Sequence, residues 1–263
     1  MNPYLTSFRA IVFREALRFL QQRERFAAAL IRPLLWLLVF AAGFRAALGL
    51  SIIPPYQTYI TYEVYIVPGL CGMVMLFNGM QSSLSLVYDR EMGSMKLLLT
   101  SPLPRWWLLF CKLAGATAIS VAQVYAFLAI TAAFGTVVPP LGYLMVLPAL
   151  IVAGLMLGSL GLLLSGIVRQ LENFAGIMNF VIFPMFFLSS ALYPLWKMAE
   201  SSEILYAICS VNPFTHAVEL IRFALYGQLN APALAWTLLA SIVFMALAIY
   251  SYNPGRTGMA RRG

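Results

Sequence analysis

Two long stretches without a single formal charge constrain what this chain can fold into. Residues 64–88 and residues 113–168 contain no Asp, Glu, Lys or Arg. A helix crosses the ~30 Å hydrocarbon core of a bilayer with about 20 residues, so the first stretch is long enough for one span. The second is broken by glycine and two prolines at residues 135–140 and is long enough for two. Stretches of this kind belong in a membrane.

The composition excludes an ordinary soluble domain. Hydrophobic residues make up 62% of the chain and charged residues only 10%, whereas roughly a quarter of the residues in soluble domains are charged. We therefore predict an all-α polytopic membrane protein that forms one transmembrane domain over residues 1–263. The six predicted transmembrane helices are 33–53, 64–87, 106–134, 141–168, 173–194 and 233–252.

The positions of the basic residues predict the orientation. With both termini in the cytoplasm, 14 of the 17 Lys and Arg residues lie in cytoplasmic segments, and only Arg45, Lys197 and Arg222 lie outside. The opposite orientation reverses this bias, so the positive-inside rule favours cytoplasmic N- and C-termini. Because the basic residues are dispersed over separate loops, the net charge of +8 does not indicate nucleic-acid binding.

Residues 4–26 are predicted to form an amphipathic helix on the membrane surface. Its basic face carries Arg14, Arg18 and Arg25, and its opposite face carries Leu, Phe and Val side chains. A basic face opposite a Leu/Phe face suits the headgroup region of an anionic inner leaflet. The alternative is a cytoplasmic helix that packs on a partner protein.

A charged segment, residues 88–104, separates the two uncharged stretches. We predict that Asp89, Arg90 and Glu91 begin a short helix, since acidic residues favour a helix N-terminus. Met and Leu residues give this helix an apolar side, and Pro102 and Pro104 end it. Apolar residues beside alternating charges favour a protein partner over solvent.

Polar and aromatic residues distinguish the second and fifth predicted spans. Asn78 and Gln81 carry amides that cannot face lipid cheaply, so they should face other helices or a water-filled path. In the fifth span, Phe180, Phe183 and Phe187 form an aromatic stripe. A cavity wall for an apolar substrate and plain helix packing explain this stripe equally well.

Residues 195–232 are predicted to form re-entrant or lid-like outer helices, because their apolar stretches are too short to span. Asn212 and Pro213 suit the N-cap and first position of a helix that runs to Tyr226, with Gly227 as its C-cap. Three ionisable residues on this helix are spaced so that they can pair with one another. They are His216, Glu219 and Arg222.

Motifs of catalytic and coupling chemistry are absent from the sequence. There is no G-x-x-x-x-G-K-[ST] loop to bind ATP, and one histidine with three scattered cysteines gives no metal site. We predict no catalytic residue and no cofactor in this chain. No acidic residue lies deep in a predicted span, which argues against an ion-coupled carrier. An active transporter of this composition needs a separate subunit to supply its energy.

Two sequence patterns point to a family. The pattern E-x-G-[ST]-x-x-x-L-L-x-[ST]-P runs from Glu91 to Pro102, and an N-P pair is followed by Arg from Asn212 to Arg222. In these patterns, and in its whole arrangement, the chain resembles the permeases of type-2 ABC exporters. This family includes drug, polysaccharide and nodulation-factor export permeases.

The resemblance implies that residues 88–104 contain a coupling helix that docks in a cleft of a separate ATPase subunit. Two permeases, as a homodimer, and two ATPases then form the working unit, with ATP and Mg bound by the ATPases alone. This chain is therefore expected not to be an enzyme. The implied ATPase-coupling residues are Asp89, Arg90, Glu91, Gly93, Ser94, Met95 and Lys96, with Arg14, Arg18 and Arg25 of the first helix.

The resemblance also implies a substrate path at the dimer axis, between the second and fifth spans, in a bacterial cytoplasmic (inner) membrane. The expected cargo is amphipathic, such as a drug, a lipid or a lipo-oligosaccharide. An ion-coupled carrier or channel and a non-transporting membrane assembly factor remain as alternatives. The candidate path residues are Asn78, Gln81, Asn179, Phe180, Phe183 and Phe187.

Overall fold

The computed structural model describes residues 3–21, 23–44, 54–56, 60–91, 103–136, 138–168 and 170–252. Over these residues the fold is all-helical. The helices, in chain order, are α1 (Pro3–Gln21), α2 (Arg23–Phe44), α3 (Tyr62–Glu91), α5 (Arg105–Ala133), α6 (Pro140–Ile167), α7 (Leu171–Phe187), α8 (Leu195–Ser201), α9 (Glu203–Val211), α10 (Pro213–Leu225) and α11 (Ala231–Ser251).

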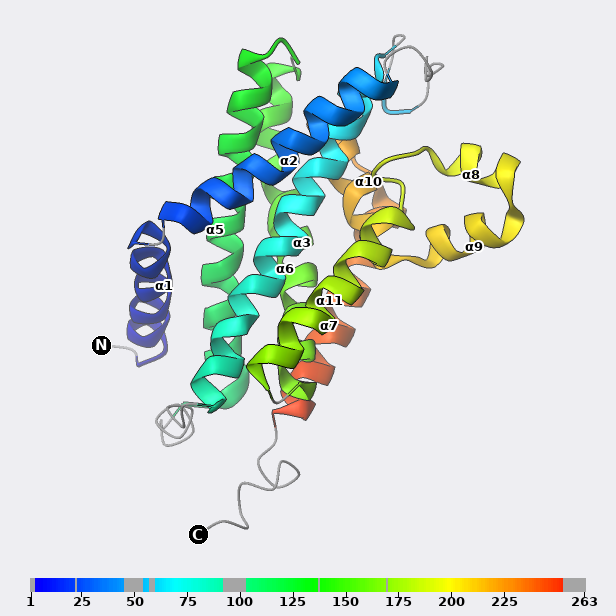
Figure 1. Cartoon of the computed structure of the whole chain (residues 1–263). Helices are drawn as coiled ribbons and strands as arrows, with labels where there is room; N and C mark the ends of the chain where they lie inside the picture. Colours follow the sequence, from blue (N-terminus) through cyan, green and yellow to red (C-terminus); the bar gives the residue numbers. More distant parts are fainter. Residues whose placement is uncertain are drawn as a thin grey trace.

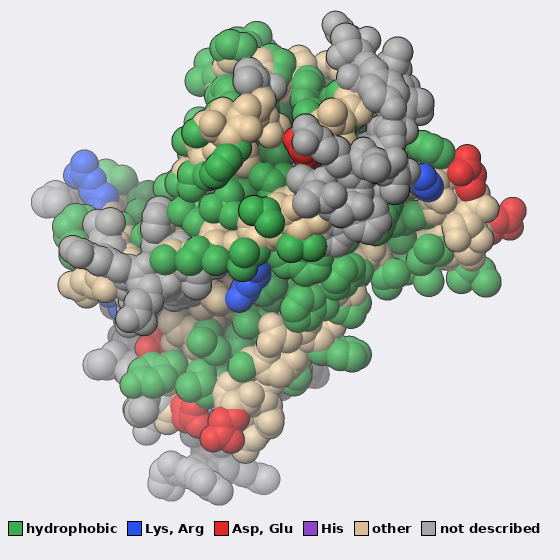
Figure 2. Space-filling model, turned by 45° about the horizontal axis from the view of Figure 1, so that its top comes forward, with side chains coloured by type: hydrophobic (Ala, Val, Ile, Leu, Met, Phe, Trp, Pro, Cys, Tyr) green, Lys and Arg blue, Asp and Glu red, His purple; other side chains and the backbone are tan. Residues whose placement is uncertain are grey.

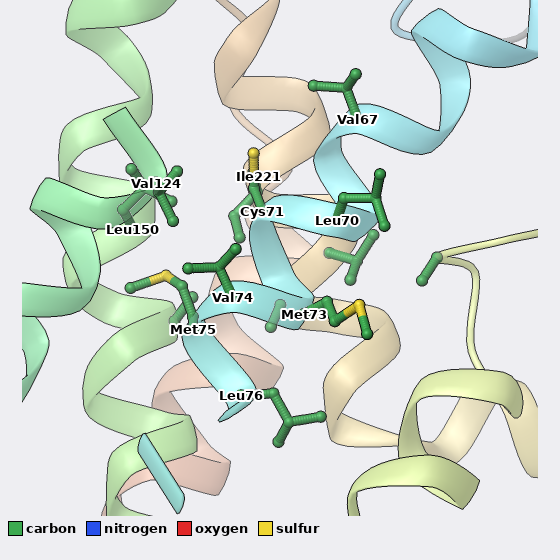
Figure 3. Close-up of a cluster of buried hydrophobic side chains, with 14 of the residues drawn as sticks. Val67, Leu70, Cys71, Met73, Val74, Met75, Leu76, Val124, Leu150 and Ile221 are labelled. Atoms are coloured by element: carbon green, nitrogen blue, oxygen red, sulfur yellow. The ribbon is translucent and has the colours of Figure 1, made fainter. Parts of the chain in front are cut away.

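Helix α3 is the centre of the bundle. Helices α2, α5, α6, α7 and α10 all pack against it. Figure 3 shows apolar side chains from its middle turns meeting Val124 of α5, Leu150 of α6 and Ile221 of α10. The sequence explains this position, because α3 carries polar side chains such as Asn78 and Gln81 that cannot face lipid cheaply and are better covered by other helices. At Gly79 an added Cβ would lie 3.0 Å from the Gly158 nitrogen of α6, so glycine permits the close approach of these two helices.

Four helices are long and apolar enough to cross a membrane, namely α3, α5, α6 and α11. Helices α9 and α10, which bend by 74° at their junction, count as a fifth span if they are taken together. Helix α7 and residues 29–39 of α2 are apolar but shorter. Hydrophobic side chains cover most of the face seen in Figure 2. The protein is a multi-pass membrane protein, and the count of six spans stays a prediction.

Figure 1 shows how the helices are arranged. Helices α3, α5 and α6 run side by side, and α2 crosses them obliquely. Helix α1 lies on one side of the bundle, and an outer arm formed by α8 and α9 projects from the other. The C-terminal ends of α3, α6 and α11 and the N-terminal ends of α5 and α7 lie at the lower end of the view. The predicted orientation makes this end cytoplasmic.

The first two predicted elements have different boundaries in the structure. The predicted interface helix 4–26 ends at Gln21, and α2 begins at Arg23, ten residues before the predicted start of the first span. Pro33, which was expected to open that span, lies inside α2. The alanines at 27–29 are strong helix formers and carry the helix to the proline. The predicted end of the span, residues 45–53, lies outside the described residues.

Two further boundaries differ from the prediction. Asp89, Arg90 and Glu91 form the last turn of α3 and do not begin a separate helix. Helix α7 ends at Phe187, seven residues before the predicted end of the fifth span. Ser189 donates a hydrogen bond to the Phe186 carbonyl and accepts one from the Ala191 N–H, so its side chain offers the backbone a turn in place of a helix. The other three predicted spans match α5, α6 and α11 within two residues at each end.

The outer helix follows its prediction closely. Asn212 is the N-cap of α10 and accepts a hydrogen bond from the Phe214 N–H at 3.0 Å, with Pro213 as the first helical residue. The helix ends at Leu225, and Gly227 adopts a φ of +70°, which favours glycine. Helix α10 packs on α3, α6 and α11, so this part of the segment predicted to be re-entrant lies within the bundle.

Candidate functional site

The cytoplasmic end of the bundle, in the predicted orientation, contains an ion pair between α3 and α5. The Lys112 Nζ lies 3.7 Å from the Asp89 carboxylate, and the Lys112 side chain is only 7% exposed. Acidic residues at a helix C-terminus are repelled by the helix dipole. Lys112 therefore offsets the charge of Asp89 and ties the last turn of α3 to α5.

The predicted ATPase-coupling residues fall into different positions at this end. Asp89 faces α5, whereas Glu91 is exposed. For Arg90 only the backbone is described, and Gly93, Ser94, Met95 and Lys96 lie outside the described residues. The sequence suggested no partner for Asp89, because Lys112 follows it by 23 residues and lies on another helix.

Helix α1 is fixed along the first half of α5. The Trp107 Nε1 donates a hydrogen bond to the Ser7 Oγ at 3.1 Å, and the Tyr4 and Trp107 rings meet edge to face at 5.5 Å. About two helix turns further on, the buried Glu15 packs against Gly115. Helix α1 thus covers the α5 segment that carries Lys112.

The predicted coupling arginines of the N-terminal region are divided between two helices. Arg14 lies on α1, is exposed, and reaches the Glu15 carboxylate at 3.5 Å. Arg18 lies on α1 and Arg25 on α2, but their side chains are outside the described part of the structure.

One face of α7 carries four of the six predicted path residues, and we call it the α7 face. It consists of Asn179, Phe180, Phe183 and Phe187, all of which are exposed. Phe180 is 78% exposed. The rings of Phe183 and Phe187 lie 6.3 Å apart and stack. The three phenylalanines form an apolar surface, with the Asn179 amide beside it, that the other described helices leave largely exposed.

Two further aromatic side chains extend the α7 face. Phe77 of α3 meets Phe183 edge to face at 6.3 Å, and Trp36 of α2 lies 5.7 Å from Phe187. Neither Phe77 nor Trp36 was predicted as a path residue. Each has mainly apolar neighbours along its helix, so nothing in the pattern separates it from core residues.

The remaining two path residues lie on α3 and are not part of the α7 face. The Asn78 side chain is 8% exposed, and its amide donates a hydrogen bond to the Gln123 Oε1 of α5. Gln81 lines a small pocket of about 30 Å³ between α2 and α3. The structure therefore does not bring the six predicted residues together on one surface.

A cluster around Arg222 joins α10 to α3 and to the turn after α7. The guanidinium is 2% exposed, pairs with Glu219, and lies 4.2 Å above the Tyr65 ring. The Arg222 Nη2 and the Tyr65 hydroxyl both donate hydrogen bonds to the Ser190 carbonyl, at 2.8 and 2.9 Å. Nearby, burial raises the pKa of Tyr56 above its ordinary value. The bundle encloses the Arg222 side chain, and its place on the outer side of the membrane stays a prediction.

His216, the third predicted member of this group, faces another helix. Its ring stacks on Trp236 of α11 at 5.5 Å. Helical spacing predicted the pairing of Glu219 with Arg222, which the structure contains. It could not predict Ser190 or Tyr65, because the turn that presents them depends on where α7 ends.

An open groove lies between the end of α7 and the outer arm. Its volume is about 620 Å³. Asn212 lies at this groove and donates hydrogen bonds to the Met185 and Leu188 carbonyls, at 2.8 and 2.5 Å. Among the described residues, no three His, Cys, Asp or Glu side chains are grouped to hold a metal ion.

Comparison with known proteins places these features in a family context. The ABC-2 type transporter family matches residues 6–226. A protein of Cyanophora paradoxa described as transport permease ycf38 is 30% identical over 249 residues, which cover 91% of this chain and 79% of that protein. The protein named as the multidrug ABC transporter permease YbhR of Escherichia coli is 28% identical over 64% of this chain and 45% of its own length. Nodulation protein J of Rhizobium leguminosarum is 31% identical over 100 residues, or 36% of this chain and 38% of that protein.

Proposed function

Because the chain belongs to the ABC-2 type transporter family, we propose that it is the permease subunit of an ATP-driven exporter. In this proposal two copies of the chain form the membrane path, and two separate ABC ATPase subunits bind ATP and Mg and supply the energy. The chain resides in a bacterial inner membrane with both termini in the cytoplasm. It carries no catalytic residue of its own.

The observation that carries the proposal is the construction of the α3–α5 end. The 88–104 segment connects these two helices, and the Asp89–Lys112 pair ties them together where the segment begins. Helix α1 is fixed to α5 at the same end by Trp107. A partner that pulls on this segment therefore moves α3 and α5 as one unit.

The cargo in this proposal is an amphipathic molecule that moves along the α7 face. Phe180, Phe183 and Phe187 present exposed aromatic rings there. This face adjoins the aromatic side chains of Phe77 and Trp36, and in a dimer it would border a path between the two copies. The Arg222 cluster holds the turn after α7, so it would fix the outer end of that path.

The test combines co-purification with transport. The tagged full-length chain is co-expressed with candidate ABC ATPases, and uptake of a fluorescent amphiphile is measured in inside-out vesicles. Gly93→Trp and Glu91→Lys should lower ATPase recovery and transport about tenfold or more, since a bulky or reversed side chain in a docked interface costs several kcal/mol. Glu200→Lys makes the same charge change on the outer arm and should leave both unchanged.

Two results would contradict the proposal in favour of its alternatives. Transport that survives ATP depletion and stops when the ion gradient is dissipated would identify an ion-coupled carrier or channel. Normal complex formation with no cargo movement and no cargo-stimulated ATP hydrolysis would identify an assembly factor.

A further inference from the structure

The pocket between α2 and α3 has an unusual set of polar groups for its position. Its volume is about 30 Å³. Arg32, Asn78 and Gln81 are polar residues that line it among apolar side chains, and none of the lining residues is acidic. The lining residues are Ala29, Arg32, Pro33, Met73, Val74, Phe77, Asn78 and Gln81.

Arg32 is the charged group of this pocket. It is half-buried, and its guanidinium lies 4.0 Å from the centre of the Phe77 ring. Within the part of the chain that the structure describes, no Asp or Glu forms an ion pair with it. A charged side chain within a membrane bundle is normally paired or faces a functional cavity. The contrast with Arg222 is direct, because that arginine pairs with Glu219.

The pocket and the α7 face meet at one side chain, Phe77. Phe77 belongs to both, since it lines the pocket under Arg32 and meets Phe183 edge to face at 6.3 Å. From Phe183 the aromatic surface continues to Phe187 and to Trp36 of α2. A cation and amide groups thus adjoin an exposed apolar strip.

The size of the pocket limits what can enter it. Its volume suits a group no larger than a few atoms, such as the oxygens of a carboxylate or phosphate, and is too small for a sugar ring or a drug. A planar guanidinium binds such oxygens through paired N–H donors. An apolar chain of any length can lie outside the pocket, along the rings of the α7 face.

We propose that this pocket binds the anionic head of an amphiphile whose apolar chain lies against Phe183, Phe187 and Trp36. Arg32 supplies the counter-charge, and Gln81 lines the head-group position. In its role as a cargo site the pocket rests on the proposed function, and it narrows the cargo class to anionic amphiphiles. Binding itself requires neither ATP nor the ATPase.

The experiment measures binding to the purified full-length chain in nanodiscs of phosphatidylcholine alone. The probes are 11-(dansylamino)undecanoic acid and its methyl ester, which differ only in the charge of the head. The wild-type chain should bind the acid about tenfold more tightly than the ester, the ratio expected for one charge-assisted contact. Arg32→Gln should bring this ratio close to one while leaving the affinity for the ester unchanged, and Arg32→Lys should keep most of it.

Matched variants separate the contribution of the anionic head of the probe from that of its apolar chain. Arg9→Gln removes an exposed arginine of α1 and should leave both affinities unchanged. Phe183→Ala should weaken the acid and the ester by the same factor. If Arg32→Gln does not fold, Gln81→Glu places a carboxylate beside Arg32 and should weaken the acid alone. Free inorganic phosphate at millimolar concentration should not displace the acid, because phosphate has no apolar chain to bind the α7 face.

Three results would overturn this inference. They are equal affinities of the wild-type chain for the two probes, an unchanged ratio in Arg32→Gln, and full displacement of the acid by inorganic phosphate. Because the assay contains no nucleotide, its result is independent of ATPase coupling. A chain that couples to an ATPase but shows no preference for the acid would leave the proposed function standing and remove only this site.

Discussion

At the residue scale, Arg222 shows how one side chain can hold three separate parts of a membrane protein together. It lies on α10, pairs with Glu219 of the same helix, covers the Tyr65 ring of α3, and donates to the Ser190 carbonyl in the turn after α7. That carbonyl lies beyond the end of a helix, and among the described residues no backbone N–H donates to it. Unsatisfied polar groups within a membrane cost several kcal/mol, so the turn depends on these donors.

Replacing Arg222 should therefore destabilise the fold. We expect Arg222→Met to cost about 3–5 kcal/mol, because Glu219 would keep a partly buried charge without a partner. The double variant Glu219→Gln/Arg222→Met should recover part of the loss. Apparent Tm values in detergent, followed by the tryptophan fluorescence, would check this order. A double variant as unstable as the single one would show that the charge pair is not the cause.

At the element scale, α7 and α10 are joined end to end through Asn212. Helix α7 has 17 residues and is only about 25 Å long, so it ends within the thickness of a bilayer. The Asn212 side chain accepts from the Phe214 N–H to cap α10, and its amide N–H groups donate to the last carbonyls of α7. One side chain thus forms hydrogen bonds with backbone groups at the end of α7 and at the start of α10.

This double role can be separated by substitution. Asn212→Asp keeps the capping acceptor but removes the donors and sets a carboxylate against two carbonyls. We expect Asn212→Asp to be at least as destabilising as Asn212→Ala. The loss of the N-cap in Asn212→Ala should by itself lower the stability by about 1–2 kcal/mol. Asn230 caps α11 through the Ala233 N–H, so Asn230→Asp is the matched control and should be tolerated. Thermal unfolding of these three variants and the wild-type chain checks this, and a stable Asn212→Asp variant would show that Asn212 acts only as a cap of α10.

The same elements show how much the sequence predicts. The length of the apolar stretches predicted α5, α6 and α11, and the capping residues predicted α10. Both signals depend only on residues that are close to one another in the sequence. The end of α7 at Phe187 and the continuation of α2 through Pro33 were not predicted, since packing partners from distant segments decide them. At the site, the Phe stripe of α7 was predicted from its spacing. Arg32, Trp36 and Lys112 were missed as site residues, because their partners lie on other helices.

At the scale of the whole molecule, the helices differ in how much of their apolar surface the bundle covers. Helix α3 is enclosed, whereas α11 leaves most of its apolar surface exposed, as a helix at the lipid boundary does. The α7 face is also exposed, but it adjoins Arg32, Phe77 and Trp36 and not a plain apolar surface. We assign the α7 face to the partner copy and the α11 face to lipid.

Cross-linking tests this assignment. The native cysteines Cys71, Cys111 and Cys209 are buried and should not react. Phe180→Cys, treated with a short bis-maleimide in native membranes, should give a covalent dimer. Phe134→Cys is the control, because Phe134 is 80% exposed at the end of α5, far from the α7 face. Equal cross-linking of both variants, or none at position 180, would exclude a dimer axis at the α7 face.

The central position of α3 has a thermodynamic consequence. One end of this helix adjoins the predicted docking segment, and its middle carries Phe77, which contacts both Arg32 and the α7 face. Close-packed interiors transmit displacement instead of absorbing it. If nucleotide state in the ATPase changes the affinity for cargo through α3, then cargo must change the affinity for nucleotide by the same factor. Bound cargo would then change how tightly the ATPase binds nucleotide.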